Sequence, residues 1–589
     1  MTSGARALAF LACPPADFAR LTGCLRAAAP DARWDFVCFY PPPADPGGEV
    51  RVLRPVRRVG FALGLVARAL LRPYRSVWIA VEDLRRVDAV MPVIALSLLL
   101  RAGARSLIDR AGARRPLAAA WREPAALIVA GALLPLARAV TALGLALVPP
   151  RAPAACTGGE EGNPARVPLP KRTGLVIPLL PDLSHTFVYR EALELLRRHP
   201  DWEALVLEAG DDRVVHREAA ELGRRATRVP VLGPARYLLV YLRHWLTRPR
   251  AMAGLVRFFQ PHTASFGPGA TADDAEAFLR LEYLQHSNHV ARGLMLAEHL
   301  RRRRIGYVHV WGTTYPAVRA LVAHRLLGVR VSLSTFVDFD YPTPFHMLAE
   351  KLAAARFVTT CSAYCATRLG ARFPAARLEV LRPSVAPGYA EGKPRRPRDG
   401  RSRLVYVGRF VAKKGLDTLL EACALLRTRG VAIDAHLYGG GEEEARLRAL
   451  AERRGLNGAV RFEGPIPNER LYETMNEDDV LVVPSRLMAD GERDGIPVVL
   501  IEAMAAGVTA VSTRVSGIPE LIEPGVNGYL VPPDDPAALA DLLAVLLARP
   551  DMRERVRAGA RRTVRERFDL ESAGARLAGW ISRETASGA

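Results

Sequence analysis

A chain of 589 residues is too long for one hydrophobic core, and the usual size of domains predicts three or four. Its hydrophobic content of 50% and charged content of 24% are those of a globular protein and exclude a disordered one. The net charge of +21 accompanies no basic–aromatic stripe and no nucleic-acid motif, so we exclude nucleic acid as a partner. Residues 1–172 hold 24 Lys or Arg against 12 Asp or Glu, a net charge of +12, which keeps an anionic membrane surface as a candidate partner.

The seven cysteines are scattered and odd in number, which does not fit a disulfide framework. Cys361 and Cys365 lie four residues apart without a second Cys or His pair nearby, so we expect no zinc site. The first residues lack the long apolar run of a signal peptide. These features predict a cytoplasmic location.

Residues 1–123 alternate short apolar runs with helical stretches, a pattern that predicts an N-terminal α/β region of unknown role. The predicted strands are Ala7–Ala12, Trp34–Tyr40, Ser76–Val81 and Ser106–Ile108.

Residues 124–150 are almost wholly apolar. Ala125–Val148 is long enough to span a bilayer, for which about 20 apolar residues suffice. Arg138 near its middle would cost roughly 2.5–3.5 kcal/mol in a bilayer, and Pro135 would kink a helix. A spanning helix, an interfacial helix pair and a buried core helix therefore all remain open, with membrane contact favoured. Residues 151–172 are rich in Pro and Gly and are predicted to be a linker.

Two further α/β units are predicted, over residues 173–387 and 403–568. Residues 388–402 read as a linker between them, and residues 569–589 as a C-terminal helix and tail. Continuous apolar strands between helices favour parallel sheets that are covered on both faces. Two such units in tandem predict a ligand site where the carboxyl ends of their strands face each other.

The most informative stretch is residues 489–507, in which the carboxylates of Asp494 and Glu502 lie eight residues apart. Gly495 and Pro497 suit a turn and the first turn of a helix. We therefore expect Asp494 in a loop and Glu502 within the helix that follows. Free N–H groups at the start of that helix suit an anion, and the carboxylates suit hydroxyl groups around it. A diphosphate flanked by sugars fits this pattern.

Two cations follow the strand predicted near residue 405. Arg409 comes after the turn residue Gly408, and Lys414 precedes the next helix. A bound diphosphate needs such fixed cations at a strand end. Lysine occurs only five times in the chain, and two of the five are Lys413 and Lys414. This indicates that the site requires a compact ammonium group rather than a guanidinium.

Three more segments are predicted to reach the same site. They are the glycine turn with Gly439 and Gly441, the strand and turn that end at Pro465 and Ile466, and the buried strand before Ser485.

Together these residues resemble the GT-B glycosyltransferases of family 4, the retaining nucleotide-sugar transferases. The resemblance covers roughly residues 173–580 and is strongest over 403–535. The motifs that carry it are Gly408-Arg409 with Lys414-Gly415, Val483-Pro484-Ser485, Asp494 with Glu502-Ala503-Met504-Ala505, and Ser516-Gly517-Ile518-Pro519-Glu520-Leu521. The runs Asp490–Pro497 and Leu183–Phe187 most resemble the exopolysaccharide-assembly branch.

The resemblance implies an α/β fold of GT-B type, with two facing Rossmann-like domains preceded by the extra N-terminal region. Arg409 and Lys414 would bind the donor diphosphate, Glu502 the ribose hydroxyls, and Asp494 the sugar and diphosphate. The other implied donor-binding residues are Gly408, Gly439, Gly441, Pro465, Ile466, Ser485, Gly495, Ile496, Pro497 and Val498. Candidates on the acceptor side are Ser184, His185 and Asp338. No cofactor and no metal are implied, because cations of the protein stabilise the leaving group.

Two positions depart from the family pattern. Asp494 stands where the family usually has a glutamate, and Phe336 stands where it often has a histidine near the sugar. We expect a glycosyltransferase that moves a sugar from a nucleotide-sugar donor to a glycan acceptor, lipid-linked in the favoured reading, in cell-surface or exopolysaccharide biosynthesis. The expected location is the inner face of the cell membrane. The alternatives are a glycolipid glycosyltransferase and a non-catalytic GT-B scaffold, which Phe336 favours.

Overall fold

The computed structural model describes residues 6–12, 33–38, 74–81, 102–109, 114–116, 140–148, 172–182, 185–210, 216–232, 234–259, 289–336, 347–386, 388–389, 402–467, 470, 475–489 and 491–586. These residues belong to two compact units, which are described separately.

The first unit contains a five-stranded sheet with the order β2-β1-β3-β4-β5. The four strands β1 to β4 pair in parallel, and β5 runs antiparallel to β4. The strands are β1 (Arg6–Ala12), β2 (Arg33–Cys38), β3 (Tyr74–Val81), β4 (Ala102–Asp109) and β5 (Arg114–Pro116). The four strands that the sequence predicts in this region are therefore present.

Two helices also belong to the first unit: one over residues 140–147 and α7 (Pro234–Thr247). They contact each other through the hydroxyl groups of Thr141 and Tyr241, and Gly144 packs against the ring of Trp245. Within the described ranges, no helix combines the length and the apolar character needed to cross a bilayer. Residues 124–139, the larger part of the predicted apolar segment, lie outside those ranges.

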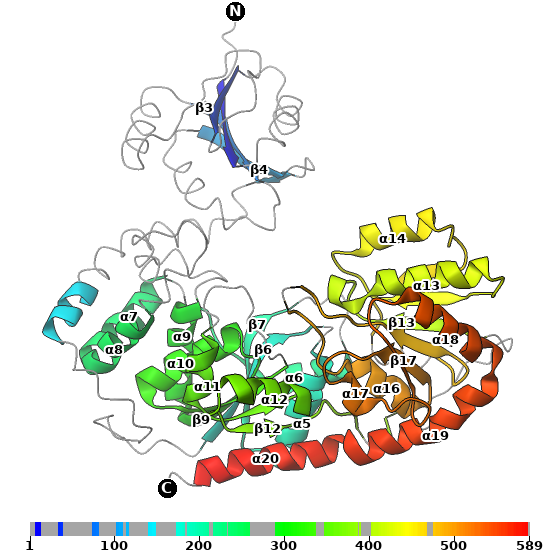
Figure 1. Ribbon diagram of the computed structural model, residues 1–589. Coiled ribbons are helices and arrows are strands. Elements are labelled where there is room, and N and C mark those ends of the chain that lie inside the picture. The colour runs from blue at the N-terminus through cyan, green and yellow to red at the C-terminus, as the bar shows by residue number, and fades with distance from the viewer. Residues whose placement is uncertain are drawn as a thin grey trace, which may run out of the picture. The chain divides into compact units, whose positions relative to one another are not determined.

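The second unit contains two parallel sheets, each with its helices, which we call the first and second lobes (Figure 1). The first lobe has seven strands in the order β12-β11-β10-β9-β6-β7-β8. They are β6 (Arg172–Leu180), β7 (Glu203–Ala209), β8 (Thr227–Arg228), β9 (Ile305–Trp311), β10 (Arg330–Thr335), β11 (Ala355–Thr360) and β12 (Leu378–Val380). Its helices are α5 (Thr186–Arg198), α6 (Arg217–Arg225), α8 (Pro249–Phe259), α9 (His289–Arg303), α10 (Tyr315–Leu327), α11 (Leu348–Ala354) and α12 (Ala363–Arg372). Every residue of β9 is buried, as expected for a parallel strand covered on both faces.

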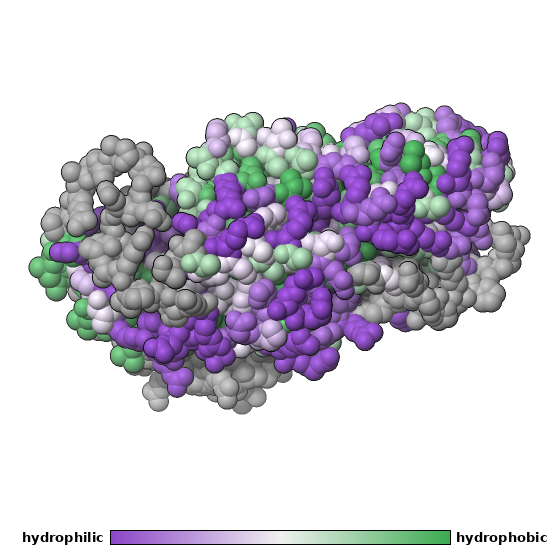
Figure 2. Space-filling view, turned by 90° about the horizontal axis from the view of Figure 1, so that it is seen from below, coloured by the Kyte–Doolittle hydropathy of each residue, from purple (hydrophilic) through white to green (hydrophobic). Residues whose placement is uncertain are grey.

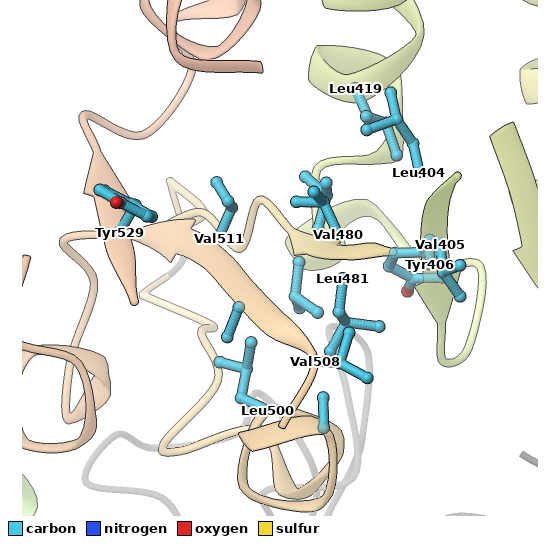
Figure 3. Close-up of a cluster of buried hydrophobic side chains, with 14 of the residues drawn as sticks. Leu404, Val405, Tyr406, Leu419, Val480, Leu481, Leu500, Val508, Val511 and Tyr529 are labelled. Carbon is cyan, nitrogen blue, oxygen red and sulfur yellow. The ribbon is translucent and has the colours of Figure 1, made fainter. Parts of the chain in front are cut away.

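The second lobe has six strands in the order β15-β14-β13-β16-β17-β18. They are β13 (Leu404–Val407), β14 (Ala435–Tyr438), β15 (Val460–Gly464), β16 (Val480–Val483), β17 (Thr509–Thr513) and β18 (Tyr529–Val531). Its helices are α13 (Leu416–Thr428), α14 (Glu444–Arg453), α16 (Val498–Ala506), α17 (Ile518–Leu521), α18 (Pro536–Ala548) and α19 (Pro550–Arg567). Leu419 from α13 and Leu500 from α16 pack on opposite sides of β16, so both faces of this sheet are covered (Figure 3).

The C-terminal helix α20 (Leu570–Ala586) leaves the second lobe and packs on the first (Figure 1). Leu577 and Ile581 join the buried core of the first lobe, and Trp580 contacts Phe357 of β11. Glu584 forms ion pairs with Arg356 and Arg377 of that lobe. The face of the molecule on which α20 lies is mostly hydrophilic (Figure 2). The crossing ties the two lobes together at the end of the chain.

Candidate functional site

An ion pair between Lys414 and Asp494 marks the edge of the second lobe where its strands end. Lys414 is the last residue of the short 3₁₀ helix η7 (Ala412–Lys414) after β13, and its Nζ lies 2.8 Å from Oδ2 of Asp494. Ser485, which follows β16, donates to the same Oδ2 at 2.7 Å. Burial alone would raise the pKa of Asp494, but the charges of Lys414 and Lys413 and hydrogen bonds from Lys414 and Ser485 hold it below its ordinary value. Asp494 is therefore a largely buried carboxylate, with a side chain 11% exposed, whose charge is compensated within the lobe.

The loop that carries Lys414 is packed closely on the segment after β16. Gly415 has φ +64°, and a Cβ there would lie 2.1 Å from the backbone oxygen of Pro484. The N–H of Arg486 donates to the carbonyl of Lys413 at 2.9 Å. The Nζ of Lys413 bonds Oε1 of Glu492 at 2.8 Å. The two neighbouring lysines thus have different acidic partners, and the glycine is what lets their loop approach so closely.

Arg409 comes directly after the strand β13, and its side chain is exposed. The hydroxyl of Tyr406, at the end of that strand, donates to the carbonyl of Arg409 at 2.9 Å. Burial raises the pKa of Tyr406, the charge of Asp494 raises it further, and the charge of Arg409 lowers it. Arg409 and Asp494 therefore both lie within electrostatic range of one buried hydroxyl.

The other residues implied in donor binding follow the ends of neighbouring strands. Gly439 and Gly441 come after β14, and Pro465 and Ile466 come after β15. Gly495, Ile496 and Pro497 lead into α16, whose first residue is Val498. The carboxyl ends of parallel strands share one edge of a sheet, so these residues all follow the same edge of the second lobe, as the sequence predicted. Their roles stay predictions.

Glu502 lies within α16, as expected, but its carboxylate is bonded to the first lobe. Its Oε1 accepts hydrogen bonds from Nη1 of Arg190 on α5 at 2.7 Å and from the hydroxyl of Tyr389 at 3.1 Å. Arg190 also reaches Glu218 of α6. The sequence assigned Glu502 to ribose hydroxyls and gave no sign of this contact.

Further contacts between the two lobes lie near α12. Gly495 lies against Cys361, because a Cβ on the glycine would be 2.5 Å from the cysteine Sγ. Glu520 of α17 accepts from the backbone N–H groups of Ala363 and Tyr364, at the start of α12. Arg382 of the first lobe also donates to Glu520 at 2.8 Å. A carboxylate is favourable at a helix N-terminus, so the second lobe caps a helix of the first.

On the acceptor side, His185 lies beside Asp182, with Nδ1 and Oδ1 2.7 Å apart. Ser184 and Asp338 lie outside the described residues. Phe336 packs edge-on against Phe187, with ring centroids 4.6 Å apart, so it offers an apolar contact where the family often has a histidine. Within the described ranges, no three His, Cys, Asp or Glu side chains gather as metal ligands.

Comparison with known proteins finds a family match over the second lobe. The family described as "Glycosyl transferases group 1" matches residues 391–563, which include the Lys414–Asp494 pair and Glu502. This segment is similar to the group 1 glycosyltransferases. A segment of 176 residues of this chain is 40% identical to the putative colanic acid biosynthesis glycosyltransferase WcaL of Salmonella typhimurium. The segment makes up 30% of this chain and 43% of WcaL. The amylovoran biosynthesis glycosyltransferase AmsK of Erwinia amylovora is 38% identical over 29% of this chain and 42% of its own.

The matched segments span less than half the length of these two relatives. A glycosyltransferase structure from Rickettsia africae is similar over 71% of this chain and 99% of that one, with a TM-score of 0.51 and 14% identity. At that identity the likeness concerns the fold alone. The group 1 match and the two parallel sheets agree with the predicted GT-B fold. The names of the two relatives agree with the predicted resemblance to the exopolysaccharide-assembly branch.

Proposed function

We propose that the chain transfers a sugar from a nucleotide-sugar donor to a glycan acceptor in the assembly of an exopolysaccharide. The observation that carries the proposal is the Lys414–Asp494–Ser485 arrangement at the strand ends of the segment that matches the group 1 glycosyltransferases. Relatives with 38% and 40% identity are named for amylovoran and colanic acid biosynthesis, which supports the class of product.

In this proposal the cations of the second lobe stabilise the leaving nucleoside diphosphate. Lys414 is held in place by Asp494, so its ammonium is positioned before the donor arrives. Arg409, which follows strand β13 of the same lobe, is exposed and supplies a second cation. Preorganised charges act where negative charge develops as the sugar–phosphate bond breaks, and they cost little reorganisation. The reaction would need no metal, and the acceptor would attack from the face that the leaving group vacates, with retention at the sugar carbon.

A non-catalytic scaffold is the second candidate, and Phe336 favours it. The ring of Phe336 packs on Phe187, so this position contributes no polar group for the sugar. The ion pairs of Lys414 and Glu502 favour the enzyme, because they hold charged groups in fixed positions, as stabilising a charged leaving group requires.

The experiment that separates them is donor hydrolysis by the purified full chain. UDP-, GDP- and dTDP-sugars are incubated with the protein, and free nucleoside diphosphate is measured. Slow release from one donor, lost in Glu502→Ala, would support the enzyme and identify its donor. Binding in a thermal-shift assay without release, also when candidate lipid-linked acceptors are added, would support the scaffold.

We also propose that the helix over 140–147 and α7 dock on an anionic membrane. Their leucines are unusually exposed: Leu143 60%, Leu147 71%, Leu239 66% and Leu246 83%. The two helices carry Arg236 and Arg243 and no acidic residue. Leucines that enter the lipid and arginines that reach the headgroups suit an anionic bilayer surface. A lipid-linked acceptor would be presented at that surface.

Co-sedimentation with vesicles tests the docking surface. We expect the full chain to bind vesicles that contain phosphatidylglycerol more strongly than vesicles of phosphatidylcholine alone, and Leu239→Glu with Leu246→Glu to abolish the binding. The control is Val545→Glu on α18, where the valine is 43% exposed. Equal loss in the control, or no loss in the double variant, would contradict the assignment.

A further inference from the structure

The imidazole of His185 and the carboxylate of Asp182 form a hydrogen-bonded pair at the carboxyl end of the first-lobe sheet. Asp182 follows β6, and His185 directly precedes α5. Nδ1 of the ring lies 2.7 Å from Oδ1 of the carboxylate, and the backbone N–H of His185 donates to the carbonyl of Asp182 at 3.5 Å. The two side chains are 31% and 28% exposed, so the pair is open to a molecule in solution.

The bond to Asp182 determines which nitrogen of the His185 ring is left for a ligand. A carboxylate only accepts, so Nδ1 of the neutral ring carries the proton and Nε2 has the lone pair. Within the described parts of the chain, no group bonds Nε2. A ring that a carboxylate holds in this tautomer has the arrangement of a general base. The carboxylate also stabilises the imidazolium that forms when Nε2 takes a proton.

Tyr189 and Tyr315 also interact with the charge of Asp182, but their hydroxyls are committed as donors. Each donates to a backbone carbonyl of β6, at 2.9 Å and 3.1 Å respectively. Burial raises the pKa of both hydroxyls, and the charge of Asp182 raises it further. Both tyrosines therefore stay protonated. Of these three side chains that surround Asp182, that of His185 is the one that can take a proton.

The helix α5 links this pair to the second lobe. Arg190, five residues after His185, donates to Glu502 of α16 at 2.7 Å. At about 1.5 Å per residue, His185 lies roughly 7.5 Å along the helix from Arg190. The second lobe holds the donor in the proposed function. A hydroxyl group that binds at Nε2 of His185 is therefore close to the lobe from which the sugar comes.

We propose that His185 is a catalytic base and that Asp182 is its positioning residue. Nε2 takes the proton of the acceptor hydroxyl while the acceptor oxygen bonds to the sugar carbon. The bond from that carbon to the diphosphate breaks, and its electron pair leaves with the nucleoside diphosphate. The inference rests on the proposed function and adds the group that activates the acceptor. A water molecule that hydrolyses the donor loses a proton to Nε2 in the same way.

The test compares a nucleophile that must lose a proton with one that has none. Release of nucleoside diphosphate from UDP-, GDP- and dTDP-sugars by the full chain is measured in sodium azide and in sodium chloride of the same concentration. General-base catalysis contributes about 10²–10⁴-fold, so in chloride His185→Gln should be at least about 100-fold slower than wild type. In azide the two rates should become similar and glycosyl azide should form, because azide attacks without losing a proton.

Two further variants test the base and its orientation. His185→Gly leaves room for a free imidazole, so added imidazole should restore part of the hydrolysis. In Asp182→Asn the amide can donate to Nδ1 and leave the proton on Nε2, so hydrolysis should fall by about tenfold or more and azide should relieve the loss. A merely structural role of either residue would not respond to azide or imidazole.

His199→Gln is the matched control. His199 is a partly exposed histidine at the other end of α5, where its ring stacks on Trp202 with centroids 4.1 Å apart. This variant should keep the wild-type rate in both salts. Dissociation constants of UDP, GDP and dTDP, measured by calorimetry, should be the same for wild type and His185→Gln, since the proposed base acts on the acceptor.

The outcomes separate this inference from the proposed function. Equal rates of wild type and His185→Gln in chloride would overturn the role of His185 and leave the transferase standing. A loss that azide does not relieve in His185→Gln, nor imidazole in His185→Gly, would also overturn it. If wild type releases no nucleoside diphosphate from any of the donors in either salt, the proposed function fails, and this inference with it.

Discussion

Glu191→Gln should make the protein more stable at neutral and alkaline pH. Glu191 follows Arg190 on α5, is buried, and accepts a hydrogen bond from Nε1 of Trp311 at 2.8 Å. Burial raises the pKa of its carboxyl to about 7, although the bond from Trp311 acts in the opposite direction. When folding raises the pKa of a carboxyl, the protein has its full stability below the unfolded pKa, here near 4.5. The free energy of unfolding then decreases as the pH rises from there through about 7.

The size of the effect follows from the same shift. A rise from 4.5 to about 7, at 1.36 kcal/mol per pKa unit, corresponds to about 3 kcal/mol of stability lost between these pH values. Glutamine keeps the acceptor for Trp311 and cannot ionise. The difference in unfolding free energy between variant and wild type should therefore be close to zero near pH 4.5 and reach about 3 kcal/mol by pH 8.

The assay is urea unfolding followed by tryptophan fluorescence between pH 4.5 and pH 8. Glu221→Gln on α6 is the control, because that carboxylate is partly exposed and should give a small difference at every pH. A variant that is less stable than wild type throughout would show that the Glu191 carboxylate is charged and stabilising. A difference that does not change with pH would equally refute the reasoning.

The remaining predictions concern the second lobe. Lys414→Ala should lower kcat by roughly a thousandfold, since one preorganised donor contributes about 3–4 kcal/mol to the transition state, and steady-state kinetics with the identified donor would measure it. EDTA should leave turnover unchanged; a requirement for added Mg²⁺ or Mn²⁺ would contradict the metal-free mechanism. Asp494→Asn should destabilise the protein above about pH 4 and much less in stronger acid, because a lowered native pKa gives stability that is lost as the pH falls through it. Gly415→Ala should lower the melting temperature, since its Cβ meets the oxygen of Pro484; an unchanged melting curve would mean that the loop moves freely.

The strands were predictable because their signals are local. A continuous apolar run such as residues 174–180 is typical of a strand buried in a parallel sheet. The observed strand β6 includes this run. The same holds for the loop and helix of the Asp494–Glu502 stretch. Pro497 precedes the first residue of α16, and Gly507 ends it with φ +75°, in the left-handed region that favours glycine. The sequence did not predict the ion pair of Lys414 with Asp494. Both residues follow strands of one sheet, however, so their positions at the same strand edge were predictable.

The contacts between the lobes could not be predicted in this way. Arg190 and Glu502 are 312 residues apart, and an arginine on an amphipathic helix gives no sign of its partner. The role of Glu520 was hidden for the same reason. Its motif was singled out for order and spacing, but the N–H groups that it caps belong to α12 of the other lobe. The docking of α20 on the first lobe, through Glu584, likewise depends on how the whole chain folds back.

The carboxylates of Asp494 and Glu502 have hydrogen-bond partners in different lobes, so the two residues are expected to have different roles. Asp494 is bonded within the second lobe, to Lys414 and Ser485, so these bonds do not involve the first lobe. Glu502 lies eight residues on, along a helix that rises about 1.5 Å per residue, and is bonded to Arg190 of the first lobe. A relative movement of the lobes would therefore change the surroundings of Glu502 and leave the Asp494–Lys414 pair intact. On this reasoning, variants at the lobe contacts should alter nucleotide recognition, whereas variants of the Lys414 pair should alter turnover.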